Sequence, residues 1–342
     1  MKKIKILKTS YWRTKIKNLI LKTCLLDFRL KKNIENKDEK ILIVTLGSLG
    51  DNLIETRVIE ILAEKFSKKN IYILCKNNWK IIYTLQGYFN VFVDERNWNI
   101  FYKIKLYRKL NYMNFKKIIV LNHGNVPIKL EYIYSKNIYS SYGNREYILE
   151  NQLDLLKKIL NKNFHLEDIK PDIRKYFIVN KNKSICIGIG ASGNERIMKI
   201  ETMRDIIFNL LLKFPDKEII LLGNGKREKE YVEKLMEKIV NKKVKNAIDK
   251  YTLLETLQHI YSCELFIGMD SGLMNAAIAL NKKVICTHWS KEKYSWEAPF
   301  SNVKTIKGIG GKKYIDKKYG NEILNSIKFT QIEQAMKELK FL

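Results

Sequence analysis

The chain has 342 residues, a length that favours two domains. Apolar residues make up 46% of it, which excludes a disordered chain, while 16 Gly, 4 Pro and 5 Cys exclude collagen-like and disulfide-rich proteins. Its 64 Lys and Arg against 36 Asp and Glu give a net charge of +28, which predicts an anionic partner: a nucleic acid, an acidic lipid or a phosphorylated substrate. The excess is uneven, with +20 in residues 1–183 and +8 in residues 184–342.

The first 39 residues are predicted to be a basic amphipathic extension. Residues 1–32 hold eleven Lys or Arg against the single Asp27, and their apolar residues recur at helical spacing. This pattern predicts a helix that either lies on an anionic membrane surface or packs on the domain behind it. Residues 33–39 read as a polar linker.

From Lys40 onward, strand and helix patterns alternate, which predicts an α/β fold with parallel sheets. We expect a first domain over 40–178, and the stretch from around Pro171 through NKNKS is predicted to be a hinge between the two domains. The predicted strands of the first domain are 40–46, 70–75 and 116–122, and its predicted helices are 52–66 and 146–161.

A second domain is expected over 184–320, followed by a C-terminal helix in 321–342. Its strands are predicted at 184–190, 217–225 (a strand and its turn), 264–270 and 282–288, of which 282–288 is the last clear strand. Its helices are predicted at 201–214, 227–240, 252–263 and 271–281. Four apolar residues of the C-terminal helix share one face: Ile332, Ala335, Met336 and Leu339. In doubly wound sheets ligands bind at the carboxyl ends of the strands, so we expect the site in a cleft between the domains.

The compartment is predicted to be the cytoplasm. The longest apolar runs fall short of the ~20 residues of a membrane-spanning helix, and the basic N-terminus is not followed by the apolar segment of a secretory signal. Five scattered cysteines favour a reducing environment. His259 and Cys263 are spaced as a metal-binding pair on a helix, but nothing nearby supplies further ligands, so we expect no metal site there.

Three motifs follow predicted strands. Gly47-Ser-Leu-Gly-Asp51 leads into a helix, and its Asp51 is either a helix cap or a general base at the mouth of a cleft. Gly188–Gly193 matches the dinucleotide pattern G-x-G-x-x-G, but no helix opens at once after it, and Arg196 and Lys199 in the following loop suit phosphate better. Asp270-Ser-Gly-Leu-Met-Asn275 opens a helix whose first N–H groups can bind a diphosphate, unless Asp270 is an ordinary cap.

Together these motifs resemble the bacterial heptosyltransferase family, glycosyltransferase family 9. The resemblance rests on ILIVTLGSLGDNLIETRVIEIL, on GASGNERIMKIETMRDII and on TLLETLQHIYSCELFIGMDSGLMNAAIALNKKVI, and it runs from Lys40 to the C-terminus. It implies a GT-B fold of two Rossmann-like, doubly wound domains facing a central cleft, the first binding the acceptor and the second a nucleotide sugar. The implied reaction moves a heptose from ADP-heptose to an anionic lipopolysaccharide or lipooligosaccharide core, inverting the anomeric centre without a metal.

The basic first half fits an anionic glycolipid acceptor, and the chain contains no D-x-D metal motif. We therefore expect no cofactor besides the nucleotide-sugar substrate, no nucleic-acid partner, and a location at the inner face of the cytoplasmic membrane. Three alternatives stay open. They are the same fold with another nucleotide sugar or a protein acceptor, a family member that binds without turnover, and a basic nucleic-acid-binding protein.

The resemblance also assigns roles to residues. Asp51 is the expected catalytic base, Arg196 stands where the family has Lys, and the Ser271–Gly272 helix start stabilises the leaving diphosphate. The further donor-binding residues are Ser192, Lys199, Gly223, Glu228, Thr252, Leu253, Asp270, Leu273 and Asn275, and the acceptor-binding residues are Ser48, Gly50 and Arg57. Four positions depart from the family pattern, Arg57 and Lys199 (Pro in the family), Met198 (Trp) and Asn275 (His), and these departures bear on the identity of the donor sugar.

Overall fold

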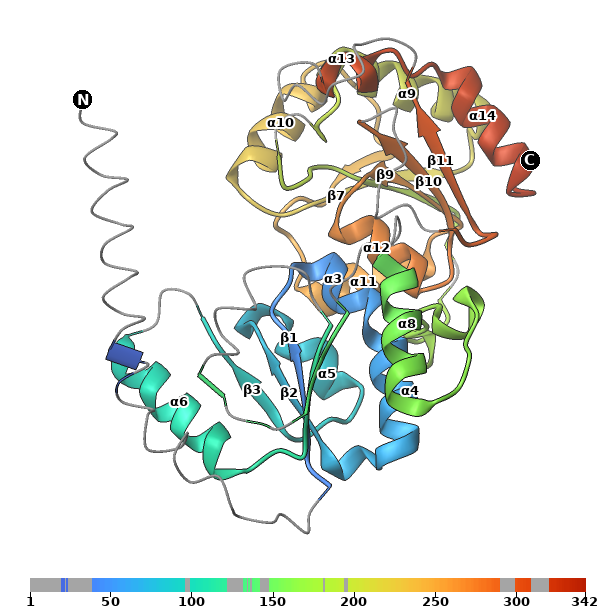
Figure 1. Ribbon diagram of the computed structural model, residues 1–342. Coiled ribbons are helices and arrows are strands. Elements are labelled where there is room, and N and C mark those ends of the chain that lie inside the picture. Colours follow the sequence, from blue (N-terminus) through green and yellow to red (C-terminus); the bar gives the residue numbers. More distant parts are fainter. Residues whose placement is uncertain are drawn as a thin grey trace. The chain divides into compact units, whose positions relative to one another are not determined.

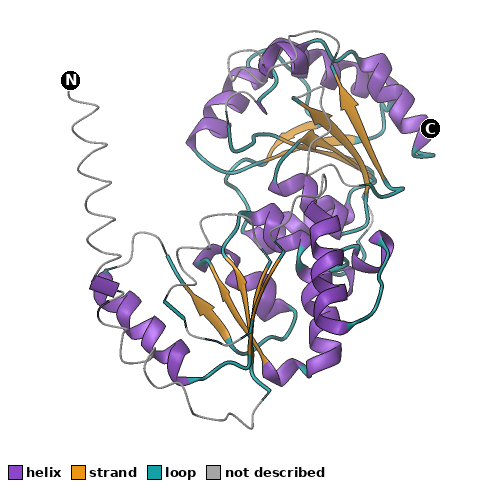
Figure 2. Cartoon of the chain, in the orientation of Figure 1, coloured by secondary structure: helices purple, strands orange, loops and turns teal. Residues whose placement is uncertain are grey.

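The computed structural model contains two compact units, each built on a parallel sheet (Figures 1 and 2). It describes residues 20, 21, 23, 39–95, 99–121, 132, 133, 135, 137–141, 148–180, 182–193, 196–289, 299–308 and 320–342. By contacts, unit 1 comprises 1–47, 58–143 and 154–162, and unit 2 comprises 48–57, 144–153 and 163–342. The sequence-based boundaries, drawn as continuous stretches, stay predictions. Nearly all of the basic extension lies outside the described residues.

Unit 1 holds a five-stranded sheet in the order β3-β2-β1-β4-β5, with all neighbours parallel. Its strands are β1 (Ile41–Thr45), β2 (Ile71–Cys75), β3 (Val91–Val93), β4 (Lys117–Val120) and β5 (Ile138–Ser140). Its helices are α5 (Lys80–Leu85) and α6 (Ile100–Tyr112), and it shares α4 (Thr56–Phe66) and α8 (Ile148–Leu160) with unit 2. β1 is the central strand and every residue of it is buried, as its unbroken apolar run predicts for a parallel sheet.

Unit 2 holds a six-stranded sheet in the order β11-β10-β9-β6-β7-β8, again entirely parallel. Its strands are β6 (Ser184–Gly188), β7 (Glu218–Leu222), β8 (Val244–Asn246), β9 (Leu265–Met269), β10 (Lys283–His288) and β11 (Val303–Lys307). Its helices are α3 (Leu49–Ile54), α9 (Ile200–Lys213), α10 (Lys226–Met236), α11 (Leu253–Ser262), α12 (Gly272–Ala279), α13 (Gly320–Asn325) and α14 (Phe329–Glu338).

The sequence indicates 282–288 as the last clear strand, and the structure adds β11 after it, paired with β10 at the edge of the sheet. Only two of its five residues are buried, so its apolar signal is weak. The predicted face of the C-terminal helix is confirmed: Ile332, Ala335, Met336 and Leu339 are all buried in the core formed by α9, α10, α14 and the strands. Within the described ranges, no helix combines the length and the apolar character needed to cross a membrane.

Both sheets change winding direction next to their first strand. In unit 1 this switch point lies between β1 and β4, and in unit 2 it lies between β6 and β9. At a switch point the loops after two neighbouring strands diverge and leave a crevice at the carboxyl edge, where ligands of such folds bind. The loop after β1 leads to Asp51, and the loops after β6 and β9 lead to Arg196 and Asp270. The sequence motifs therefore stand where this topology places ligands.

Candidate active site

Asp51 lies in the first turn of α3. The turn predicted for residues 47–51 already contains the helix start, because α3 begins at Leu49. The backbone N–H and the hydroxyl of Ser48 both donate to Asp51 Oδ2, the hydroxyl at 2.8 Å, while Oδ1 accepts no hydrogen bond from the described residues. Asp51 is half-buried. Asp51 thus takes part in the helix cap, and one of its two oxygens has no hydrogen-bond donor among the described residues.

Helix α3 packs closely against α12 through two glycines. A Cβ on Gly272 would lie 2.9 Å from Leu49 Cβ, and a Cβ on Gly50 would overlap the side-chain amide of Asn275. Asn275 is 4% exposed, and no described residue hydrogen-bonds its buried Oδ1. These contacts lie within unit 2 and bring the residue before Asp51 onto the helix that follows Asp270. Two motifs more than 200 residues apart in sequence therefore form one site.

The start of α12 is capped by Ser271, whose hydroxyl accepts from the N–H of Met274 at 3.4 Å. The interpretation of Asp270 as the cap is therefore wrong. The N–H groups of Gly272 and Leu273 belong to the first turn, where an α-helix offers them no backbone partner. The positive end of the helix dipole adds to them, so this turn can hold an anionic group.

Asp270 instead pairs with Arg196, with 3.1 Å between Oδ2 and Nη1. The two side chains are 9% and 22% exposed. Burial raises the pKa of the Asp270 carboxyl above its ordinary value, although the charges of Arg196 and His288 oppose the effect. The negative charge of Asp51 also raises the pKa of Asp270, so the two carboxylates are close enough to interact electrostatically.

Comparison with known proteins identifies the family. The model of glycosyltransferase family 9 (heptosyltransferase) matches residues 148–325. This chain belongs to glycosyltransferase family 9. The lipopolysaccharide heptosyltransferase 1 of Campylobacter coli is 25% identical over 346 residues, covering 88% of this chain and 98% of the relative. The lipooligosaccharide heptosyltransferase 2 of Campylobacter jejuni is 26% identical over 182 residues, which cover 51% of this chain and 54% of the relative.

Solved structures agree on the fold. The E. coli heptosyltransferase WaaC with ADP-2-deoxy-2-fluoro heptose has a TM-score of 0.66 at 12% identity. The alignment covers 87% of this chain and 99% of the WaaC chain. The family 9 glycosyl transferase of Veillonella parvula has a TM-score of 0.68 at 15% identity, covering 91% and 99%. The predicted family membership, the α/β fold of the GT-B heptosyltransferases and the assignment as a glycosyltransferase are confirmed.

In this family 9 glycosyltransferase, two residues at the site were missed by the sequence reasoning. His288 ends β10 and Trp289 follows it, beside Asp270 at the same edge of the sheet. The Arg196 guanidinium lies 5.1 Å from the centre of the Trp289 ring, and the rings of His288 and Trp289 stack at 6.0 Å. Their position at the end of a predicted strand was the available signal.

The glycine loops of unit 2 enclose Glu228. Gly190 and Gly225 have φ angles of +96° and +115°, which favour glycine, and a Cβ on Gly190 would lie 2.5 Å from the Glu228 side chain. Glu228 is 8% exposed and pairs with its neighbour Arg227. Because α9 begins only at Ile200, Gly188–Gly193 does not form the dinucleotide-binding turn. The loop nevertheless follows β6 at the switch point between β6 and β9, where ligands of such folds bind.

The remaining predicted site residues either contact other residues of the protein or are exposed to solvent. Thr252 caps α11 through a capping box with Glu255 and precedes Leu253, the first helical residue. The backbone N–H of Lys199 donates to Asn325 at 2.7 Å, whereas Ser192 is exposed. Arg57 Nε donates to the carbonyl of Asp168 at 3.3 Å. These contacts neither require nor exclude a role in binding.

His259 and Cys263, which are spaced as a metal-binding pair, make other contacts in the structure. The His259 ring stacks on Tyr251 at 4.1 Å, and the Cys263 thiol points to the carbonyls of Ile260 and Leu265. Among the described residues, no three His, Cys, Asp or Glu side chains are grouped so that they could hold a metal ion.

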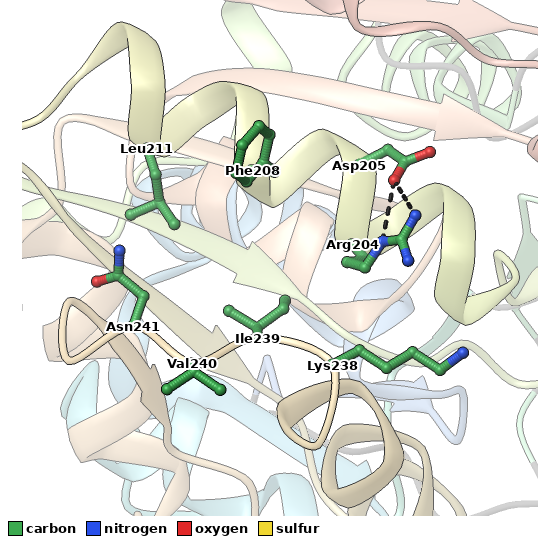
Figure 3. Close-up of a pocket in the computed structure, with 8 residues that line it drawn as sticks. All are labelled: Arg204, Asp205, Phe208, Leu211, Lys238, Ile239, Val240 and Asn241. Carbon is green, nitrogen blue, oxygen red and sulfur yellow. Dashed lines mark hydrogen bonds and ion pairs between the residues drawn. The ribbon is translucent and has the colours of Figure 1, made fainter.

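A pocket of about 520 Å³ lies away from this site, between α9 and the segment after α10 (Figure 3). Apolar side chains line one part of it and charged side chains the other. The lining residues are Arg204, Asp205, Phe208, Leu211, Lys238, Ile239, Val240 and Asn241. None of the predicted site residues is among them.

Proposed function

We propose that this family 9 glycosyltransferase moves a heptose from ADP-heptose to a hydroxyl of an anionic lipopolysaccharide core, with inversion and without a metal ion. The observation that carries the proposal is the Asp51 carboxylate, held by Ser48 through Oδ2 and open at Oδ1, on a helix packed against the start of α12. The names of the Campylobacter relatives and the ADP-heptose analogue in the WaaC structure support the choice of donor and acceptor.

The proposed reaction is a single displacement. The acceptor hydroxyl gives its proton to Asp51 Oδ1 as its oxygen attacks the anomeric carbon of the donor sugar. The bond from that carbon to the diphosphate oxygen breaks, and its electron pair leaves with ADP. Arg196 and the first N–H groups of α12 stabilise the growing charge on the diphosphate. Attack opposite the leaving group inverts the anomeric centre.

Asp51→Asn tests the base. The amide keeps the size of the side chain but cannot take a proton, so kcat should fall about 10²–10⁴-fold, the usual contribution of a general base. ADP affinity should stay unchanged, since the base does not bind the nucleotide. Glu64→Gln, an exposed carboxylate on α4, is the matched control and should behave as wild type. An Asp51→Asn variant with wild-type kcat would exclude Asp51 as the base.

Calorimetric binding of ADP, UDP and GDP tests the donor. Selective binding of ADP supports ADP-heptose. A preference for UDP or GDP would keep the chemistry but assign another nucleotide sugar, consistent with Asn275 in place of the family's His. Binding of none of the three would overturn the proposal and make a nucleic acid the next partner to test.

The same proposal places the enzyme at the inner face of the cytoplasmic membrane, because its acceptor is a lipid and residues 1–32 carry ten net positive charges. Sedimentation with anionic vesicles, with and without residues 1–32, tests this placement. Equal binding of both forms would rule out the extension as the anchor.

A further inference from the structure

An aromatic side chain that follows the carboxyl end of β10 lies next to the positively charged side chain of the proposed donor site. β9 and β10 are neighbouring strands, so Asp270 after β9 and Trp289 after β10 emerge side by side. Arg196 comes from the loop after β6, on the other side of β9. Its guanidinium pairs with Asp270 at 3.1 Å and lies 5.1 Å from the centre of the Trp289 ring.

Trp289 is 5% exposed and belongs to the core of unit 2, but this ring faces a charged group as well as apolar neighbours. His288, 2% exposed, stacks on it at 6.0 Å with 27° between the ring planes. This stacking and the burial of both rings restrict the movement of the indole. A fixed aromatic ring attracts a guanidinium through its quadrupole and limits the rotamers of a long, flexible side chain.

We propose that Trp289 is a positioning residue that holds Arg196 in place for the donor diphosphate. The inference rests on the proposed function, in which Arg196 stabilises the leaving group. A guanidinium has five N–H donors in a rigid fork, so a ring that fixes its plane also fixes the direction of its remaining bonds. Asp270 supplies the opposite charge, and Trp289 sets the orientation.

The proposal predicts a loss specific to the second phosphate. Trp289→Leu removes the ring, so ADP affinity and kcat should each fall about tenfold, in line with the strength of a cation–π interaction in a desolvated site. AMP affinity should change less than twofold, because the second phosphate is missing. Trp289→Phe keeps a ring face and should recover most of the loss. Equal weakening of ADP and AMP would overturn the proposal, since it would indicate general damage to the site.

A double-mutant cycle separates positioning from core packing. In an Arg196→Gln background, Trp289→Leu should cost little further ADP affinity, because the residue through which it acts is gone. Additive losses would overturn the proposal. Phe214→Leu is the matched control: Phe214 packs on the same core and has Lys217 5.8 Å from its ring, so this variant should lower thermal stability while leaving the ADP-to-AMP ratio intact.

The roles proposed for Arg196 and Trp289 can fail separately. If Arg196→Gln itself leaves ADP binding unchanged, the proposed role of Arg196 at the diphosphate is wrong. If Arg196→Gln weakens ADP binding and Trp289→Leu does not, only the positioning role of Trp289 is wrong. If calorimetry selects UDP or GDP, the same experiment applies with that diphosphate and its monophosphate.

Discussion

The starts of α3 and α12 each have an aspartate near a serine cap, but the two carboxylates have different surroundings. Each helix begins at a serine cap soon after a strand at a topological switch point, and each has an aspartate within three residues of that cap. Asp51 is half-buried inside the helix and bonded to its own cap through one oxygen, with the other open. Asp270 precedes its cap and is buried against the cation of Arg196.

The comparison shows that the position of an aspartate relative to the helix cap decides whether its carboxylate stays near solvent or is buried against a cation. An aspartate three residues after the cap turns back to the helix start and stays near solvent, where it can accept a proton. One before the cap ends the strand and points into the carboxyl edge of the sheet, where its charge must be neutralised. Unit 2 thus combines a half-buried carboxylate, the base of the proposed reaction, with a buried ion pair.

The packing of the two helices gives the largest expected effect on stability. Gly272→Ala places a Cβ 2.9 Å from Leu49 Cβ, a rigid part of the side chain, and should lower the free energy of unfolding by about 1–3 kcal/mol. Gly50→Ala should cost less, because it meets only the end of the Asn275 side chain. Urea unfolding measures both.

Second-site variants test the assigned contacts. Leu49→Ala removes the Cγ and Cδ2 atoms that lie 3.1 Å from the new Cβ but keeps Leu49 Cβ, so it should rescue only a small part of the loss in Gly272→Ala. Asn275→Ala removes the amide that the new side chain meets and should rescue more of the loss in Gly50→Ala. Neither substitution should rescue the other glycine variant. Rescue by the crossed pairs would contradict the contacts between α3 and α12.

The buried carboxylate gives a pH-dependent effect. Because the pKa of Asp270 is raised in the folded protein, its protonated form stabilises the fold, and this contribution is lost as pH rises from the ordinary value of 3.8 through the raised pKa. Asp270→Asn cannot ionise, so the variant lacks the net cost of ionising the buried carboxyl, a cost that already includes the pairing of Asp270 with Arg196. The stability of the variant relative to wild type should therefore increase with pH.

Urea unfolding of both proteins from pH 4 upward measures this trend. Asp205→Asn, which removes an exposed carboxylate from α9, corrects for the general effect of one negative charge in a basic protein. A relative stability that falls as pH rises would show that the ion pair with Arg196 outweighs burial.

Much of the fold and part of the site could be predicted from the sequence, for identifiable reasons. The buried strands β1, β6 and β9 are continuous apolar runs, and the motif at 270–275 joins a strand directly to a helix. The three-residue strands β3, β5 and β8 are too short to carry a pattern, and they pair only because neighbouring strands present a free edge. Their existence is a property of the assembled sheet.

The site, too, has features that the sequence predicts and features that only the folded structure shows. Asp51, Arg196 and Asp270 stand in recognisable motifs, whereas the contact between Trp289 and Arg196 joins residues on different loops of the sheet. That contact depends on strand order, which local patterns do not encode. Likewise, the sequence left Asp51 as cap or base, and only the position of the helix start at Leu49 makes both uses compatible.

The smallest expected effect comes from the two serine caps, and it sharpens the contrast between the helices. Ser48→Ala removes the hydroxyl that bonds Asp51 Oδ2 at 2.8 Å, so it should cost about 1 kcal/mol of stability and lower kcat a few-fold while ADP affinity stays unchanged. Ser271→Ala removes a longer cap bond of 3.4 Å beside the proposed diphosphate site, so it should cost less stability and act on ADP affinity instead. Steady-state kinetics and calorimetry on both variants distinguish the two patterns. If both serines affected kcat and ADP affinity alike, the helix starts would act as one unit, and the division of labour between Asp51 and α12 would be wrong.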